Sequence, residues 1–416
     1  MKDEKKTIWA WAFYDWANSA FATTVMAGFF PLFFKKFWAV NLSFEKSTFY
    51  LGTANSLSAV IIAVLAPFLG AAADKGSMKK KMLLCFAFLG IVNTFSLFAV
   101  SEGKWLPALL LYFTAYAGFA GGNLFYDSLI TDVASVKKRD FVSSLGFALG
   151  YIGGGILFLI NVLMYLKPSF FGIPDSTTAV CIAFISVACW WGVFTLPLIL
   201  FVKEPKNKFP LSFIDSFRSG WKQLKDTLIN IKQYKQAILF LIAYWFYIDG
   251  VYTIIKMAVD YGASMNFPAG SLITALLLVQ FVAFPAALIY GWIGVRIGVK
   301  TALLIGIIAY CFITIFGFVM QEIWQFYAIA VLVGLFQGGI QALSRSLFAS
   351  LIPDDKSGEF FGFYNMLGKF AAVLGPFMIG MVALLSGSNR YGILSLIVLF
   401  AAGALILTRV DSSRTT

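Results

Sequence analysis

The sequence contains no histidine and few charged residues. Only 12% of its 416 residues are charged, while 60% are hydrophobic, and apolar stretches of near twenty residues recur along it. This composition excludes a soluble globular domain. Stretches of that length are typical of membrane-spanning helices, and the alternating ten-residue strands of a membrane barrel are not seen. The sequence therefore predicts an all-α membrane protein.

Cysteine is also scarce, and its positions carry no pattern. The four cysteines are scattered through apolar segments, which predicts no disulfide framework. Histidine, the commonest acid–base group and metal ligand, is absent. No Gly-x-Ser-x-Gly motif and no cluster of cysteine ligands takes its place. We therefore expect no enzyme activity, no cofactor and no metal.

Hydropathy divides the chain into twelve predicted spans with a polar segment in the middle. The domains expected are an N-terminal six-helix half (1–202), a linker (203–235) and a C-terminal six-helix half (236–416). The predicted spans are 8–34, 48–73, 82–101, 105–131, 141–166, 177–202, 236–260, 269–294, 301–320, 324–349, 360–385 and 391–408.

Basic residues fall mainly on one side of this topology. If both termini are cytoplasmic, most of the 32 lysines and arginines are cytoplasmic as well. The net charge of +12 follows from this asymmetry, so no nucleic-acid partner is needed. In the linker, apolar residues recur every three or four positions from Ile214 to Ile231, with basic residues between them. This spacing predicts an amphipathic helix at the cytoplasmic interface or against the bundle.

The two halves repeat each other at a nearly constant offset. The stretch 70–80 matches 291–300, Gly121-Gly122 matches Gly338-Gly339, and Asp140-Phe141 matches Glu359-Phe360. Such repeats indicate two pseudo-twofold halves with a substrate site between them near the middle of the membrane. Because one chain contains both halves, we expect a monomer.

The stretch from Gly70 to Lys80 resembles the loop signature of the major facilitator superfamily. Glycine, three residues, aspartate and then basic residues occur in the expected order, although Ser77 stands where the family has its second glycine. In the second copy, Val295 replaces the aspartate. The resemblance implies a cytoplasmic latch between the halves, formed by Gly70, Asp74, Lys75, Lys79 and Lys80.

Two longer stretches resemble the vacuole-effluxer-like branch of that superfamily, which includes autophagy-related amino-acid effluxers of fungi. They are residues 14–21, and residues 337–348 together with 359–362. The short loops favour a bacterial member in the cytoplasmic membrane. The resemblance implies a secondary transporter of small polar solutes, with amino acids first. A lipid, lysolipid or other amphiphile transporter, or a drug-type effluxer, on the same fold stays open.

Charged and amide side chains inside the predicted spans are the candidate substrate or coupling residues. A charge in the membrane is costly, and it is kept where it faces a bundle interior or a wet cavity. A zwitterionic solute needs both a carboxylate and a cation. The set comprises Asp15, Asn18, Asn123, Asp249, Lys256, Gln337, Gln341, Asn365 and Lys369.

Proton coupling and gating are assigned to particular carboxylates. Without histidine, coupling to protons falls to a carboxylate, with Asp15 or Asp249 first. Asp127 and Arg345 occupy corresponding positions of the two halves and carry opposite charges. We expect them to pair when the cytoplasmic side closes, and the open alternative for each polar residue is simple helix–helix bonding.

Overall fold

The computed structural model describes residues 2–205, 213–265, 267–371, 374–386 and 389–411. The described chain is helical, and twelve of its helical segments are long and apolar enough to cross a membrane. The twelve-span prediction is therefore confirmed. The main helices of the first half are α1 (Lys5–Ala20), α2 (Phe30–Phe33), α3 (Phe44–Gly76), α4 (Lys79–Ser96), α5 (Trp105–Ser128), α6 (Ile130–Val133), α7 (Arg139–Leu166) and α8 (Ser176–Phe201).

The second half follows a helix in the linker, α9 (Phe213–Ile229). Its helices are α10 (Lys235–Ser264), α11 (Ala269–Ile297), α12 (Val299–Val319), α13 (Ile323–Leu351), α14 (Ser357–Phe370), α15 (Leu374–Ser386), α16 (Asn389–Leu394) and α17 (Leu396–Thr408). The predicted single span 360–385 falls on α14 and α15, and Gly375-Pro376 lies in the first turn of α15. Proline has no backbone N–H, so it is tolerated in the first turn of a helix, where this donor has no partner within the helix.

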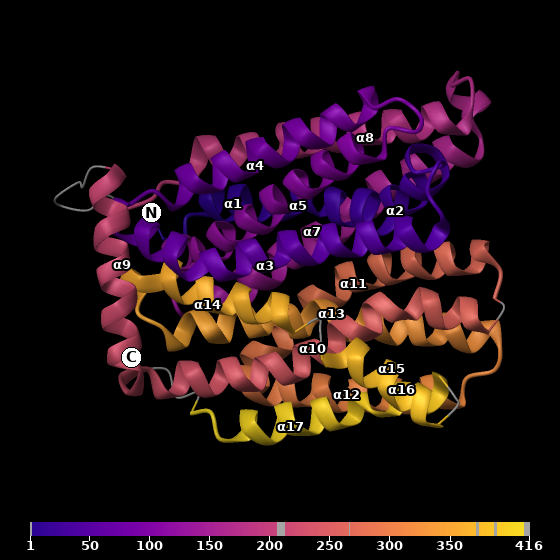
Figure 1. The fold of residues 1–416 in the computed structure, drawn as a ribbon. Helices are drawn as coiled ribbons and strands as arrows, with labels where there is room; N and C mark the ends of the chain where they lie inside the picture. Colours follow the sequence, from indigo (N-terminus) through magenta and orange to yellow (C-terminus); the bar gives the residue numbers. More distant parts are fainter. Residues whose placement is uncertain (1, 206–212, 266, 372–373, 387–388, 412–416) are drawn as a thin grey trace.

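The two halves lie side by side, and α9 runs across one end of both (Figure 1). The two chain termini lie at this same end, which we call the termini end (Figure 1). Between the halves, α3 packs against α14, and α7 packs against α11 and α13. These helix pairs bring residues from distant parts of the sequence into one interface.

The turns after the second and eighth spans show the repeat in backbone form. Ser77, between α3 and α4, has φ +48°, and Gly298, between α11 and α12, has φ +88°. Both values lie in the region that favours glycine, because other residues suffer steric conflict there. This backbone conformation explains why the family signature has a glycine at the position that Ser77 occupies in this chain.

Side chains divide as expected for a bundle in lipid. Trp11, Trp38 and Trp191 are fully buried among other apolar side chains. On the outward faces of α4 and α12, Phe88 and Phe312 are 68% and 66% exposed. Exposed aromatic side chains in the middle of long apolar helices suit contact with lipid rather than water.

Candidate functional site

A buried arginine joins the two halves. Arg345 lies on α13 in the second half and is only 2% exposed. Its Nη1 lies 3.0 Å from Oδ1 of Asp127 on α5 and 3.6 Å from Oδ2 of Asp15 on α1. Both carboxylates belong to the first half, so this cluster of one guanidinium and two carboxylates crosses the interface between the halves.

The remaining guanidinium donors are also satisfied across the interface. Arg345 Nε donates to the hydroxyl of Ser143 at 2.9 Å, and Nη2 donates to the Ser143 carbonyl oxygen at 2.9 Å. The rings of Phe147 and Trp11 lie 4.3 and 4.9 Å from the guanidinium carbon. A buried charge needs this many partners, because the free-energy cost of removing it from water otherwise exceeds the gain from its ion pairs. Gly146 leaves space for the guanidinium group, since a Cβ there would lie 3.0 Å from Nη2 of Arg345.

Each carboxylate of the cluster has a second polar partner. The Tyr126 hydroxyl donates to Asp15 Oδ2 at 3.1 Å, and the Asn365 amide donates to Asp127 Oδ2 at 3.1 Å. Both carboxylate side chains keep 13% exposure. With both ionised, the cluster carries one more negative charge than Arg345 balances. A proton or a cationic group of a solute has the charge that would balance it.

A second cluster joins the halves at the termini end. Asp74, in the last turn of α3, accepts the backbone N–H groups of Gly358 and Glu359, both at 2.9 Å. These are free donors in the first turn of α14, and a carboxylate there is favoured by hydrogen bonding and by the helix dipole. Gly70 makes the approach possible, because its Cβ would lie 2.0 Å from the Gly358 carbonyl oxygen.

Lys79 completes this second cluster. Its Nζ lies 3.3 Å from Asp74 and 3.1 Å from Asp132, and it donates to the Ser357 hydroxyl at 2.8 Å. Ser357 belongs to the second half, so Lys79 also bridges the halves. Lys75 lies in the last turn of α3, next to Asp74 in sequence.

Lys80, another residue expected in the latch, donates hydrogen bonds within its own half. Its Nζ donates to the carbonyl oxygens of Ile199 and Val202, at 2.6 and 2.7 Å, at the end of α8 in its own half. Lysine side chains often donate hydrogen bonds to the last carbonyl groups of a helix in this way. Glu204 accepts the backbone N–H groups of Lys79 and Lys80 at 2.9 and 3.1 Å. Burial raises the pKa of Glu204, while these two hydrogen bonds lower it by less.

Asp249, another predicted substrate or coupling residue, holds the start of a helix in its own half. It is fully buried on α10, and its oxygens accept the backbone N–H groups of Leu374 and Gly375 at 3.1 and 2.9 Å. The Thr253 hydroxyl donates to it at 3.2 Å. Asp249 therefore caps the first turn of α15, the second helix of the eleventh span.

The predicted amide residues fall into separate contacts. Asn18 donates to Asn123 within the first half. Gln341 accepts from the Tyr151 hydroxyl at 2.7 Å and so joins α13 to α7 across the interface. Gln337 is 8% exposed, and its Oε1 has no hydrogen-bond partner among the described residues.

The two lysines inside the spans are more open than the carboxylates. Lys256 on α10 is exposed, and Lys369 on α14 is half-buried with its Nζ 5.3 Å from the centre of the Tyr116 ring. Tyr116 belongs to α5 of the first half, so Lys369 also faces the interface. No ion pair to either lysine is found within the described part of the chain, and their charges interact with each other and with nearby carboxylates at longer range.

Sequence reasoning missed several residues that hold these clusters. Ser143, Tyr126 and Ser357 are common residue types in apolar helices, and nothing in the sequence marks them. Arg139 is buried and donates to the Ala349 carbonyl oxygen and to Asp354, each at 2.6 Å. It stands in a basic run, where a topological role is the simpler interpretation. Only the partners in the other half reveal these contacts.

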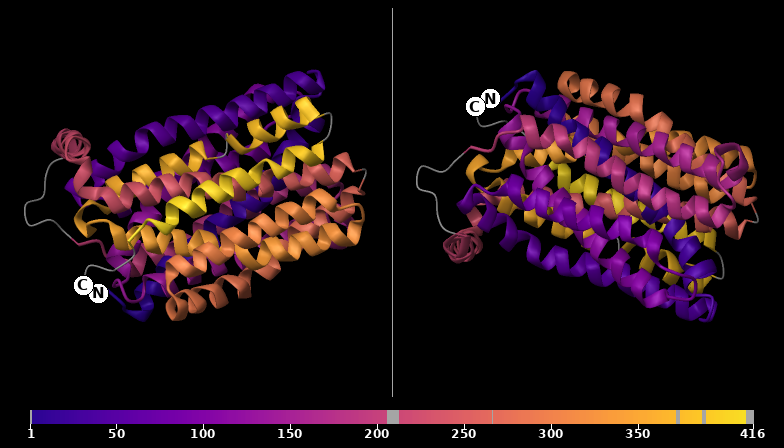
Figure 2. Two further views of the ribbon diagram at one scale, coloured as in Figure 1. Left: turned by 90° about the horizontal axis from the view of Figure 1, so that it is seen from below. Right: turned by 90° about the horizontal axis from the view of Figure 1, so that it is seen from above.

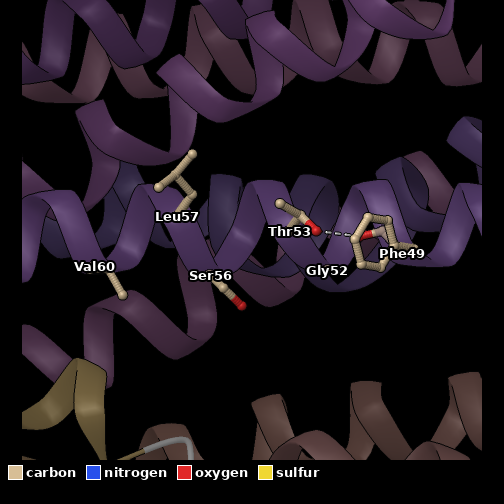
Figure 3. Close-up of a pocket in the computed structure, with 6 residues that line it drawn as sticks. All are labelled: Phe49, Gly52, Thr53, Ser56, Leu57 and Val60. Carbon is tan, nitrogen blue, oxygen red and sulfur yellow. Dashed lines mark hydrogen bonds between the residues drawn. The ribbon is translucent and has the colours of Figure 1, made fainter.

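A shallow apolar hollow lies on the N-terminal part of α3 (Figure 3). It is lined by Phe49, Gly52, Thr53, Ser56, Leu57 and Val60. Leu57 points away from Ser56 and Val60 in the close-up, and the Thr53 hydroxyl donates to the Phe49 carbonyl oxygen at 2.8 Å (Figure 3). The six lining residues named above carry no charge, so the hollow is chemically unlike the two charged clusters.

The sequence matches the family model described as "Vacuole effluxer Atg22 like" over residues 39–137 and 131–416. One similar protein is "Uncharacterized MFS-type transporter YxiO" of Bacillus subtilis (strain 168), with 41% identity over 100% of this chain and 97% of the relative. Autophagy-related protein 22 of Eremothecium gossypii is 24% identical over 92% of this chain and 80% of its own length.

Solved structures agree on the fold. The crystal structure of the human organic anion transporter MFSD10 (TETRAN) superimposes with a TM-score of 0.72 and 14% identity. The match covers 98% of this chain and 100% of that chain. The two six-helix halves are therefore those of a major facilitator fold.

Proposed function

We propose that this chain, which belongs to the vacuole effluxer Atg22-like family of the major facilitator superfamily, moves a small polar solute across a bacterial membrane by alternating access. Amino acids are the first substrate class in this proposal, as the resemblance to fungal amino-acid effluxers implies. The observation that carries this proposal is the Arg345 cluster, in which a buried charge of one half is held by Asp15 and Asp127 of the other.

Alternating access requires the halves to separate at one end and then at the other. The bonds of Asp74, Lys79 and Arg345 all link the halves between the termini end and the middle of the spans. We assign this arrangement to the state closed at the termini end. The excess of basic residues at that end supports a cytoplasmic location for it, and so an outward-facing state in the cytoplasmic membrane. Each half, 1–202 and 236–416, would then move as one unit within a monomer.

The charges suggest how a zwitterion would bind. Lys256 and Lys369 have no carboxylate within salt-bridge distance among the described residues, so they are the cations available to a substrate carboxylate. A substrate ammonium group, or a proton, would be drawn to Asp15, because the cluster has two carboxylates for one guanidinium. Occupation of Asp15 would weaken its attraction to Arg345 and favour separation of the halves. Proton coupling through Asp15 is part of this proposal.

One observation favours a different cargo. The hollow on α3 is apolar, with Phe49 67% exposed and Leu57 51% exposed. An acyl chain would fit such a surface better than a polar solute does. A lysolipid or other amphiphile transporter is therefore the second candidate.

Transport by purified protein in liposomes tests the proposal. The liposomes would be loaded with a mixed amino-acid pool, and efflux under an imposed pH gradient would be followed by mass spectrometry. Selective efflux that needs the gradient and is lost in Asp15→Asn is expected. Asp175→Asn is the matched control, because Asp175 caps α8 from an exposed position outside the spans.

Two outcomes would contradict the proposal. If no amino acid moves under either gradient, the polar-solute assignment is wrong, and movement of a fluorescent lysolipid in the same liposomes would support the second candidate. If Asp15→Asn retains gradient-driven transport, Asp15 does not couple to protons.

In Lys256→Gln and Lys369→Gln, we expect the preference for amino acids over their carboxamides to fall.

A further inference from the structure

The linker helix α9 has a buried face that holds it against both halves. Ser216, Gly220, Gln223 and Thr227 are buried and follow one another at helical spacing. A Cβ on Gly220 would lie 2.6 Å from the backbone nitrogen of Ala72, so α9 approaches α3 closely. This face accounts for the packing of α9 on the first half.

The same helix reaches the second half through polar contacts. Gln223 donates to Glu359 of α14 at 2.6 Å. The Nζ of Lys356, just before α14, lies 3.5 Å from the Thr227 hydroxyl of α9. It also donates at 2.9 Å to the hydroxyl of Tyr234, which follows α9 in the linker. Glu359 also supplies one of the backbone N–H groups that Asp74 accepts. α9 therefore touches the termini-end cluster from outside.

The opposite face of α9 is exposed and unusual for a connector. Ile214, Trp221 and Leu228 are 78%, 62% and 50% exposed, and their spacing of seven places them in one stripe. Arg218, Lys222 and Lys225 are also exposed and lie directly beside this stripe on the helix surface. The exposed acidic residues Asp215 and Asp226 lie beyond the basic ones, away from the apolar stripe.

The apolar stripe continues the lipid-facing surface of α3. The Trp221 ring meets the Phe68 ring edge-on, with centroids 5.9 Å apart. Phe68 follows Val64 and Leu65, which are 61% and 42% exposed on the outer face of α3. α9 lies at the edge of the bundle beside α3, seen end-on in both views of Figure 2. Its stripe is therefore placed where the bundle surface meets the membrane boundary.

We propose that α9 is a binding site for anionic phospholipid headgroups. Ile214, Trp221 and Leu228 enter the boundary between headgroups and acyl chains, and the neighbouring Arg218, Lys222 and Lys225 bind lipid phosphates. An amphipathic helix with this order of apolar and basic residues has the chemistry of a membrane-surface helix. Because α9 also contacts Glu359, bound anionic lipid holds the termini end closed.

Hydrogen–deuterium exchange of the whole protein in nanodiscs tests this without reference to any cargo. Discs of phosphatidylglycerol and discs of phosphatidylcholine would be compared, and exchange of amides 214–229 measured. We expect slower exchange in phosphatidylglycerol, and loss of the difference near 1 M salt, where charges are screened within about 3 Å. Equal exchange in the two lipids would overturn the proposal.

Matched variants assign the effect to α9. The triple variant Arg218→Gln/Lys222→Gln/Lys225→Gln should abolish the dependence on lipid, since each basic residue near an anionic surface strengthens binding by roughly fivefold. The control removes three exposed charges at the opposite end: Lys36→Gln/Lys104→Gln/Lys167→Gln. If this control loses the lipid dependence to the same extent, net charge is responsible and the site is wrong.

Other occupants would give different results. If inorganic phosphate added to phosphatidylcholine discs slows exchange as phosphatidylglycerol does, α9 binds a soluble anion, and lipid docking is contradicted. If protection of α9 appears only in discs that hold two protein copies, the surface is a contact between copies. The salt and lipid comparisons use the unaltered protein, so a misfolded variant does not remove the test.

Discussion

Arg345 and Asp127 lie at corresponding positions of the two halves and meet with 3.0 Å between Nη1 and Oδ1. Their side chains are 3% and 13% exposed, so water screens the pair little. A buried pair of this kind contributes modestly as a pair, yet it is costly to break by removing one partner. The contact is therefore suited to a site where two bodies must join and separate.

The first prediction concerns this pair. Arg345→Met leaves Asp15 and Asp127 without their cation, and we expect a loss of about 3–5 kcal/mol in the free energy of unfolding. The double variant Arg345→Met/Asp127→Leu should lose less than the sum of the two single variants, by about 1 kcal/mol or more. Thermal unfolding of the three variants in detergent measures this. Strictly additive losses would show that the pair is not coupled.

The second prediction concerns the close approach at Gly70. A Cβ at this position would lie 2.0 Å from the Gly358 carbonyl oxygen, so Gly70→Ala should open the termini end. Overpacking costs about 1–3 kcal/mol, which changes the ratio of closed to open by about 5- to 150-fold. The rate at which maleimide labels Ala349→Cys, in a chain without its four native cysteines, measures opening.

Gly52→Ala is the control on the same helix, because a Cβ there has open space around it. It should leave labelling of residue 349 unchanged. If Gly70→Ala and Gly52→Ala label at the same rate as the parent protein, the contact between Gly70 and Gly358 does not govern closure.

The third prediction concerns the cap on α15. Asp249→Ala removes the acceptor for the backbone N–H groups of Leu374 and Gly375, which costs about 1–2 kcal/mol. Amides in 374–386 should then exchange with deuterium about 5- to 30-fold faster. Asp249→Asn keeps one acceptor oxygen and should give a smaller effect. Unchanged exchange in Asp249→Ala would mean that α15 needs no cap.

The fourth prediction concerns pH and Glu204. Burial raises the pKa of this carboxyl group, so the folded protein binds its proton more readily than the unfolded chain does. Its contribution to stability is complete below its ordinary pKa of 4.5 and is lost as the pH rises through the raised pKa. The melting temperature of the unaltered protein should therefore fall over this range relative to Glu204→Gln. Melting temperatures that change in parallel with pH in the unaltered protein and in Glu204→Gln would contradict this prediction.

Hydropathy was enough to predict the twelve spans, because the thickness of the membrane sets the length of each helix. The motif from Gly70 to Lys79 was also readable, since its spacing along one helix end is a local property. The different partners of Lys79 and Lys80 could not be predicted from the sequence. Adjacent residues of a helix point about 100° apart, so Lys79 reaches Asp132 and Ser357 while Lys80 reaches the end of α8.

The partners of the buried carboxylates depended on tertiary packing. Asp15 and Asp249 are equivalent in the sequence as lone carboxylates in apolar helices, and both were predicted at the cavity. The structure places one beside Arg345 and the other at the start of α15. Helix class, length and repeat follow from composition and periodicity along the chain. Which charges meet depends on the rotation and depth of helices hundreds of residues apart, and only their packing sets those.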